Sequence, residues 1–286
     1  MSKIRFAACI CRRNLQKLLH DSRLFLCIAA VAVLLICRYT QELRDFCGQL
    51  QVNVSPLPVF VALTNRLYLY RLLLFLFLML ICDAPFVDRG MPYLILRSNR
   101  KSWFWGTFFT LVALALFFWS MVFAVCVLSV AGCCEWTADW GRVFLSLMKT
   151  DELMYFGSEI SFFRALGNAL QAFGWSFLLK MLVSLLLGAL TWAINLKSRK
   201  NVGVIFAVLL VLFNEWIFSW FVDRWMVYFS PVSWGSLGCL NLENSPMKIP
   251  SLRYAVCALT GALAFLLLLA WRFSLRGAVE VRTLNT

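Results

Sequence analysis

The chain has 286 residues, of which 62% are hydrophobic and only 14% are charged. Soluble globular domains are about 45–50% apolar and about 25% charged, so this chain has too much apolar surface for a soluble protein of its length. Its 27 Lys and Arg exceed its 14 Asp and Glu, for a net charge of +13. The basic residues lie mostly in short segments between apolar runs, as the positive-inside rule explains, so we expect no nucleic-acid partner. The composition predicts an all-α polytopic membrane protein.

Residues 1–23 combine apolar and basic side chains at helical spacing. Ile4, Cys11 and Leu15 share one face, while Arg12 and Lys17 lie on the rest. This pattern predicts an amphipathic N-terminal interface helix on the inner leaflet, serving as a topology anchor, a partner-docking element or both. The apolar run that follows has no small-residue cleavage site after it, so we interpret it as a retained signal-anchor.

Six apolar segments are long enough to be transmembrane helices. They are 24–37, 67–87, 104–131, 166–196, 202–222 and 254–275. With the N-terminus inside, the loops on that side hold most of the Lys and Arg, so both termini are expected to be cytoplasmic. Residues 1–286 are thus expected to form a single transmembrane domain.

Two outer loops have features of their own. After Trp140, apolar residues recur at helical spacing, which predicts a short surface helix. Residues 223–253 hold Ser230, Pro231 and Trp234 in an aromatic stretch that is too apolar for a free loop. Prolines break any continuous helix there, so we expect a re-entrant or interfacial hairpin.

Two charges, Lys180 and Glu215, fall deep inside predicted spans, where a charge is costly and usually paired. The two lie at comparable depths in neighbouring antiparallel spans. We therefore predict an intramembrane Lys180–Glu215 pair that fixes helix register, in preference to a substrate or ion contact.

Several kinds of chemistry are excluded or disfavoured by the sequence. No Gly is followed by Lys, so the chain has no P-loop for ATP. His20 is the single histidine, so a serine in a span has no histidine as general base, and we expect no enzyme and no metal site. Of the 11 cysteines, Cys47, Cys133, Cys134 and Cys239 are expected to face outward. Unpaired thiols that act as small hydrophobes are favoured over a disulfide among these four.

The cytoplasmic loop 88–101 carries a resemblance to a known family. It offers Asp88-Arg89-Gly90, then a short semi-apolar helix over Leu94–Arg97, then Ser98-Asn99-Arg100, with Gly106-Thr107 entering the next span. The outer stretch that begins at Tyr228 adds a Ser-Pro. Together with the topology, these stretches resemble ABC-2 type transporter permeases, the membrane subunits of export-type ABC transporters. The chain departs from the family pattern with Asp88 in place of Glu and Thr107 in place of Lys.

The resemblance implies a permease that works as a homodimer or a heterodimer with a second permease in a bacterial plasma (inner) membrane. It implies docking to a separate ABC ATPase subunit, which would hold the ATP and Mg, so that this chain binds no cofactor. The residues implied in coupling are Asp88, Arg89, Gly90, Tyr93, Leu94, Arg97 and Arg100. The substrate is not implied.

Two other functions remain open at this point. One is a non-transporting membrane scaffold or regulatory subunit, which would explain why no conspicuous polar path crosses the spans. The other is an ion-coupled secondary transporter built around Lys180 and Glu215, although the absence of a detectable internal repeat disfavours it.

Overall fold

The computed structural model describes residues 3–86, 100–147, 164–198, 202–220, 224–242 and 249–275. Within these ranges the regular structure is helical, as the composition predicts, and no strand forms. Two isolated bridges, Val54–Cys134 and Asn241–Ser251, are the only strand-like pairings in the described ranges.

Three helices are each long and apolar enough to cross a bilayer. They are α7 (Arg100–Ser129), α10 (Ala169–Ser198) and α12 (Leu252–Leu275). At about 1.5 Å per residue, the 30 residues of α7 or of α10 exceed the roughly 30 Å thickness of the hydrocarbon core. These helices coincide with the predicted spans 104–131, 166–196 and 254–275.

Two bent pairs of helices are candidates for further spans. α1 (Lys3–Leu19) meets α2 (Ser22–Ala32) at 67°, and α2 continues into the π-helical η1 (Val33–Tyr39). α4 (Pro56–Thr64) meets α5 (Leu67–Ile81) at 87°. The described residues thus contain three span-length helices, or up to five if each bent pair is one span. α11 (Gly203–Trp220), at the predicted segment 202–222, is apolar but falls below the span criteria.

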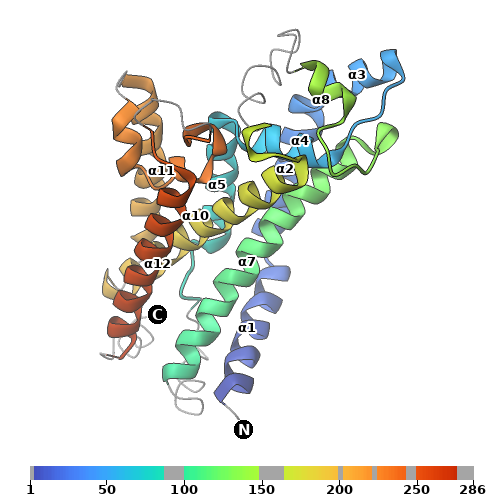
Figure 1. Cartoon of the computed structure of the whole chain (residues 1–286). Helices are drawn as coiled ribbons and strands as arrows, with labels where there is room; N and C mark the ends of the chain where they lie inside the picture. Colours follow the sequence, from blue (N-terminus) through green and yellow to red (C-terminus); the bar gives the residue numbers. More distant parts are fainter. Residues whose placement is uncertain are drawn as a thin grey trace.

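The chain reverses direction repeatedly between two ends of the molecule (Figure 1). α1 and α7 begin, and α12 ends, at one end, which we call the inner end. α3 (Gln41–Leu50) and α8 (Gly141–Leu147) lie at the opposite, outer end. The predicted surface helix after Trp140 is confirmed as α8. Trp140, Val143 and Phe144 are buried against the rest of the protein.

The sequence predicts that α1 lies on the inner leaflet, but in the structure this helix does not stand apart from the other helices. Instead it runs beside the first half of α7 (Figure 1). A Cβ at Gly106 of α7 would lie 2.8 Å from Ile10, so the missing side chain allows this close approach. Asn14 Nδ2 also donates to Thr110 Oγ1 at 3.2 Å. The buried face of α1 passes through Ala7, Ile10 and Asn14, and it is therefore rotated away from the predicted face.

The centre of the molecule is built around α10, which packs on α12, α11, α7, α4 and α5. Trp103, Trp119 and Trp192 are fully buried in this core. Trp119 Nε1 donates to Ser184 Oγ on α10 at 2.8 Å, so that its one polar atom has a partner. Large apolar side chains are exposed on α11 and α12, among them Phe206, Leu209, Phe265 and Leu268. Such a surface suits contact with lipid chains.

Candidate functional site

A group of buried polar side chains is centred on the break between α4 and α5. Thr64 Oγ1 donates to Phe60 O at 2.7 Å, and Asn65 Nδ2 donates to Val61 O at 2.7 Å. These side chains donate back to carbonyls one turn earlier in α4, and Asn65 N also donates to Val61 O at 3.2 Å. The backbone then turns extended at Arg66 before α5 begins. The sequence Thr-Asn-Arg between two apolar runs thus ends one helix and lets the next begin at a sharp angle.

Lys180 places a cation directly against this break. The residue lies in the middle of α10 and is fully buried. Its Nζ donates to Asn65 Oδ1 at 3.0 Å, Ser176 Oγ at 2.6 Å and Gly235 O at 3.3 Å. An ammonium has three protons, and these three neutral oxygens accept all of them. The charge is therefore solvated by the protein in place of water.

The same asparagine also holds the segment between α11 and α12. Leu237 N donates to Asn65 Oδ1 at 2.8 Å, and Ser236 Oγ donates to Asn65 O at 2.8 Å. We call the contacts that join Asn65, Ser176 and Lys180 to Gly235–Leu237 the polar clamp. The clamp connects a helix break, the central helix α10 and an irregular turn, all at buried positions.

The turn itself consists of short 3-10 segments. They are η4 (Arg224–Phe229), η5 (Ser233–Gly235) and η6 (Leu237–Cys239). Every residue of η5 is buried, and η5 packs on α10. Residues 224–242 thus depart from regular α-helix, and the re-entrant or interfacial hairpin expected over 223–253 stays a prediction. Irregular backbone at such a buried position requires protein partners for its polar groups, and the clamp supplies several of them.

The turn is held by close packing as well as by hydrogen bonds. A Cβ at Gly235 would lie 1.9 Å from the Tyr70 hydroxyl and 3.0 Å from Val183, so only glycine fits there. The Tyr70 ring lies near the ammonium, with Lys180 Nζ 5.5 Å from the ring centroid. The hydroxyl of Tyr70 is buried and has no hydrogen-bond partner. This hydroxyl is packed closely against Gly235.

The predicted hairpin residues have structural roles beside the clamp. Ser230 Oγ donates to Asn214 Oδ1 on α11 at 3.0 Å, and both residues are buried. Trp234 Nε1 donates to Val227 O at 2.8 Å, which closes the turn on itself. Pro231 lies between them and is partly exposed.

The predicted Lys180–Glu215 pair is wrong, because the structure gives the two residues different partners. Glu215 forms an ion pair with Arg71 of α5. Its neighbour Asn214 faces the interior, and one residue along a helix turns the side chain by about 100°. Glu215 therefore lies at the exposed side of α11, while Lys180 faces α4 and the turn. Similar depth along α10 and α11 was not sufficient for an ion pair, because Lys180 and Glu215 lie on helical faces that do not meet.

The predicted coupling residues fall almost entirely outside the described residues. These are Asp88, Arg89, Gly90, Tyr93, Leu94 and Arg97. Arg100 is described, and it is the first residue of α7.

Sequence reasoning missed most of the clamp, namely Asn65, Ser176 and Ser236, and it also missed the adjacent Tyr70. One signal was available, because Thr64, Asn65 and Arg66 interrupt an apolar run that otherwise extends from Pro56 to Ile81. That interruption marks a helix break inside a span. The long-range partners, Ser176 and Ser236, had no signal of this kind.

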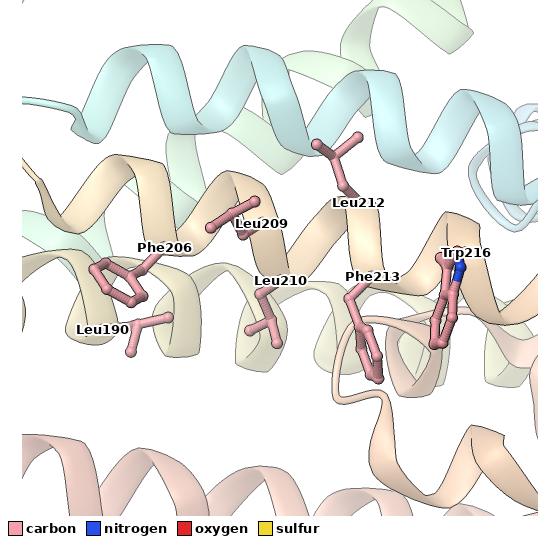
Figure 2. A pocket seen from close by; sticks show the side chains of 7 residues that line it. All are labelled: Leu190, Phe206, Leu209, Leu210, Leu212, Phe213 and Trp216. Carbon is pink, nitrogen blue, oxygen red and sulfur yellow. The ribbon is translucent and has the colours of Figure 1, made fainter.

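The described residues contain no cluster of His, Cys, Asp or Glu able to hold a metal ion. A separate concave surface runs along α10 and α11, with a volume of about 590 Å³ (Figure 2). It is lined by Leu190, Phe206, Leu209, Leu210, Leu212, Phe213 and Trp216. These side chains offer almost no hydrogen-bonding capacity, which suits a lipid chain or another apolar surface.

Comparison with known proteins adds no relative. No protein-family model matches the chain, and no curated protein or solved structure is detectably similar to it.

Proposed function

We propose that the chain is the membrane-spanning permease subunit of an ATP-driven ABC exporter, which moves its substrate by means of a separate ATPase subunit. The observation that carries the proposal is the buried turn between α11 and α12, which contains the Ser230-Pro231 step. The ABC-2 type permeases that the sequence resembles have a Ser-Pro within a re-entrant hairpin at this place. A segment of this kind, clamped against a central helix, suits a part of the outer end that opens during export.

The finer topology belongs to the same proposal. Counting each bent pair and α11 as spans gives the six crossings that we propose, with both termini in the cytoplasm of a bacterium. α1 begins and α12 ends at the inner end, which agrees with an even number of crossings (Figure 1). The permease would act as a dimer with itself or with a second permease.

Energy would enter at the inner end, because the chain has no P-loop of its own. In the proposed arrangement loop 88–101 docks on the ATPase, which holds ATP and Mg. That loop continues directly into α7 at Arg100. Closure of the ATPase would then displace α7 as a rigid body.

α7 has contacts along its length that would pass the displacement on. Near its start the close approach of Gly106 to Ile10 makes α1 move with it. Further along, the Trp119–Ser184 hydrogen bond joins α7 to α10, one turn after Lys180. A shift of α10 would pull on the polar clamp and so on the buried turn. The clamp is therefore the proposed link between docking and opening at the outer end.

The proposal is tested by purifying the tagged full-length chain from its native membrane in mild detergent and identifying the co-purifying proteins by mass spectrometry. We expect a P-loop ATPase at one copy per permease. A Leu94→Asp variant should insert normally but lose the ATPase, since a charge replaces an apolar docking residue. Ser98→Asp is the matched control, because it adds the same charge to the same loop without removing an apolar side chain.

Other outcomes would favour the alternatives. ATPase retained by Leu94→Asp would contradict the assignment of the docking loop. If no ATPase appears in any of several detergents, the permease proposal fails. Stable co-purification of other membrane proteins alone would then favour the scaffold function. Transport driven by an ion gradient without ATP would favour the ion-coupled alternative, although the Lys180–Glu215 pair on which it rested does not form.

A further inference from the structure

Two cysteines meet at the outer end of the molecule, where α3 approaches the end of α7. Cys47 lies in α3, and Cys133 lies in the short 3-10 segment η2 (Ala131–Cys133) that follows α7. α3 and η2 are in contact, although they are far apart in the sequence. Cys134 comes next along the chain. All three cysteines are unbonded thiols in the structure.

One extended segment fixes the backbone of both cysteines. Val52 N donates to Cys47 O at 3.2 Å, and Val54 N donates to Cys133 O at 2.8 Å. Glu135 N in turn donates to Val54 O at 3.0 Å. The carbonyls of the two cysteines are therefore held by residues only two positions apart. Their relative position does not depend on the side chains alone.

The side chains of Cys47 and Cys133 also lie near each other. The Cys133 side chain lies close enough to Cys47 to contribute to the raised pKa of the Cys47 thiol. Cys47 is 1% exposed, whereas Cys133 is partly exposed and so accessible to a small reagent. A disulfide requires the two Cβ atoms to lie about 3.5–4.5 Å apart. The contact between α3 and η2, and the one short segment that binds both cysteine carbonyls, hold the two residues close together.

We propose that Cys47 and Cys133 form a disulfide bond that fastens α3 covalently to the end of α7. The outer end is the side opposite the termini, and the positive-inside rule places that side outside the cytoplasm, where disulfides persist. The proposal does not depend on transport or on an ATPase. It replaces the expectation of unpaired thiols for this pair.

The chemistry balances as thiol–disulfide exchange with an external disulfide oxidant. The thiolate of one cysteine attacks the oxidant and releases one thiol, which gives a mixed disulfide. The thiolate of the second cysteine then attacks that bond and releases the other thiol. The pair loses two electrons and two protons in total, and the oxidant is reduced to two thiols.

The neighbouring Cys134 is a poor partner for either residue. Adjacent Cα atoms lie about 3.8 Å apart across a trans peptide, below the usual range of about 4.4–6.8 Å for a disulfide. A bond between Cys133 and Cys134 would therefore strain the chain. Cys134 is also the residue that forms the strand-like bridge with Val54. It is thus a matched control for the pair.

The test counts the thiols that appear only after reduction. Burial and the neighbouring Cys133 raise the pKa of the Cys47 thiol to about 12, so in the folded protein a free Cys47 would be protonated and slow to alkylate. Membranes are therefore quenched in acid, dissolved in SDS, and blocked with N-ethylmaleimide. The full-length chain is then reduced and labelled with a polyethylene-glycol maleimide, and the gel shift reports each newly released thiol.

The wild-type chain should gain two labels on reduction. Cys47→Ser and Cys133→Ser should each lose both labels, and Cys134→Ser should keep both. No reduction-dependent label in the wild type would overturn the proposal, as would loss of both labels in Cys134→Ser with retention in Cys47→Ser.

A second measurement on the wild-type chain covers the case in which a variant fails to accumulate. Peptide mass spectrometry without reduction should find the Cys47 peptide joined to the peptide that contains Cys133 and Cys134, at a mass two hydrogens below the sum. Finding the two peptides only as separate alkylated species would overturn the proposal.

Discussion

Two basic residues, the buried Lys180 and the exposed Arg23, are stabilised in different ways. Lys180 is fully buried at the polar clamp, and three neutral oxygens accept its protons. Arg23 lies at the start of α2, with its side chain 41% exposed, and pairs with the carboxylate of Asp83 at 2.6 Å. The buried cation is held by dipoles from three elements, whereas the exposed one pairs with two carboxylates, those of Asp83 and Asp21.

The two sites should therefore contribute differently to the free energy of unfolding. An exposed ion pair is screened by water and stabilises a protein by about 0–1 kcal/mol. A buried ammonium, by contrast, depends on each of its acceptors, because nothing else solvates it. The clamp should therefore be sensitive to the loss of a single neutral side chain, while the Arg23–Asp83 pair should tolerate neutralisation.

The largest effect is expected from Asn65→Leu. This change removes the oxygen that accepts from both Lys180 and Leu237 N and leaves a buried charge poorly solvated. We expect a loss of about 3–5 kcal/mol in the free energy of unfolding, as for breaking a buried pair. Thermal unfolding in detergent, followed by tryptophan fluorescence, measures it.

Lys180→Met sharpens the same comparison. Alone it should cost less than Asn65→Leu, because it removes the charge together with its need for acceptors. Added to Asn65→Leu it should recover part of the lost stability. Strictly additive losses would show that the ammonium does not depend on Asn65.

A smaller effect is expected from Gly235→Ala, which tests the packing of the buried turn. The new Cβ would overlap the Tyr70 hydroxyl, at 1.9 Å, and overpacking of this kind costs about 1–3 kcal/mol. Gly238→Ala is the control, because its nearest neighbour is Ser236 Oγ at 3.8 Å. Tyr70→Phe should restore part of the stability of Gly235→Ala. Equal unfolding temperatures for the two alanine variants would contradict the packing account.

Gly106→Ala should loosen α1 from α7 at a cost of about 1–2 kcal/mol, since the Cβ would lie 2.8 Å from Ile10. Limited trypsin digestion of membranes should then cut faster at Arg12 and Arg13. Gly261→Ala in α12 has open space around it and should change nothing. Digestion of Gly106→Ala at the wild-type rate would argue against the close contact.

The smallest effect is expected from Asp83→Asn, which breaks the exposed ion pair with Arg23. The loss should be below about 1 kcal/mol and should vanish at high salt. A double-mutant cycle with Arg23→Gln measures the coupling. A coupling as large as that at Asn65 would remove the distinction between the two cations.

Much of the helical framework followed from composition and apolar run length. The predicted spans at 104–131, 166–196 and 254–275 match α7, α10 and α12. A long uninterrupted apolar run predicts a helix reliably, because a helix pairs its backbone polar groups within the segment. The broken span around Asn65 was not predicted. Its helix α4 is only nine residues long and begins with Pro56 and Pro58, so its pattern resembles a loop.

The sequence by itself determined that the chain is helical, that it suits a membrane, that it has no P-loop and that the turn after α11 leaves regular helix. Tertiary structure alone decided which residues share a buried site. Lys180 is solvated by Asn65 and Gly235, and Glu215 by Arg71, because each helix's rotation about its axis depends on packing against its neighbours. Apolar run length carries no information about that rotation, and close contacts such as Gly235 with Tyr70 fix it.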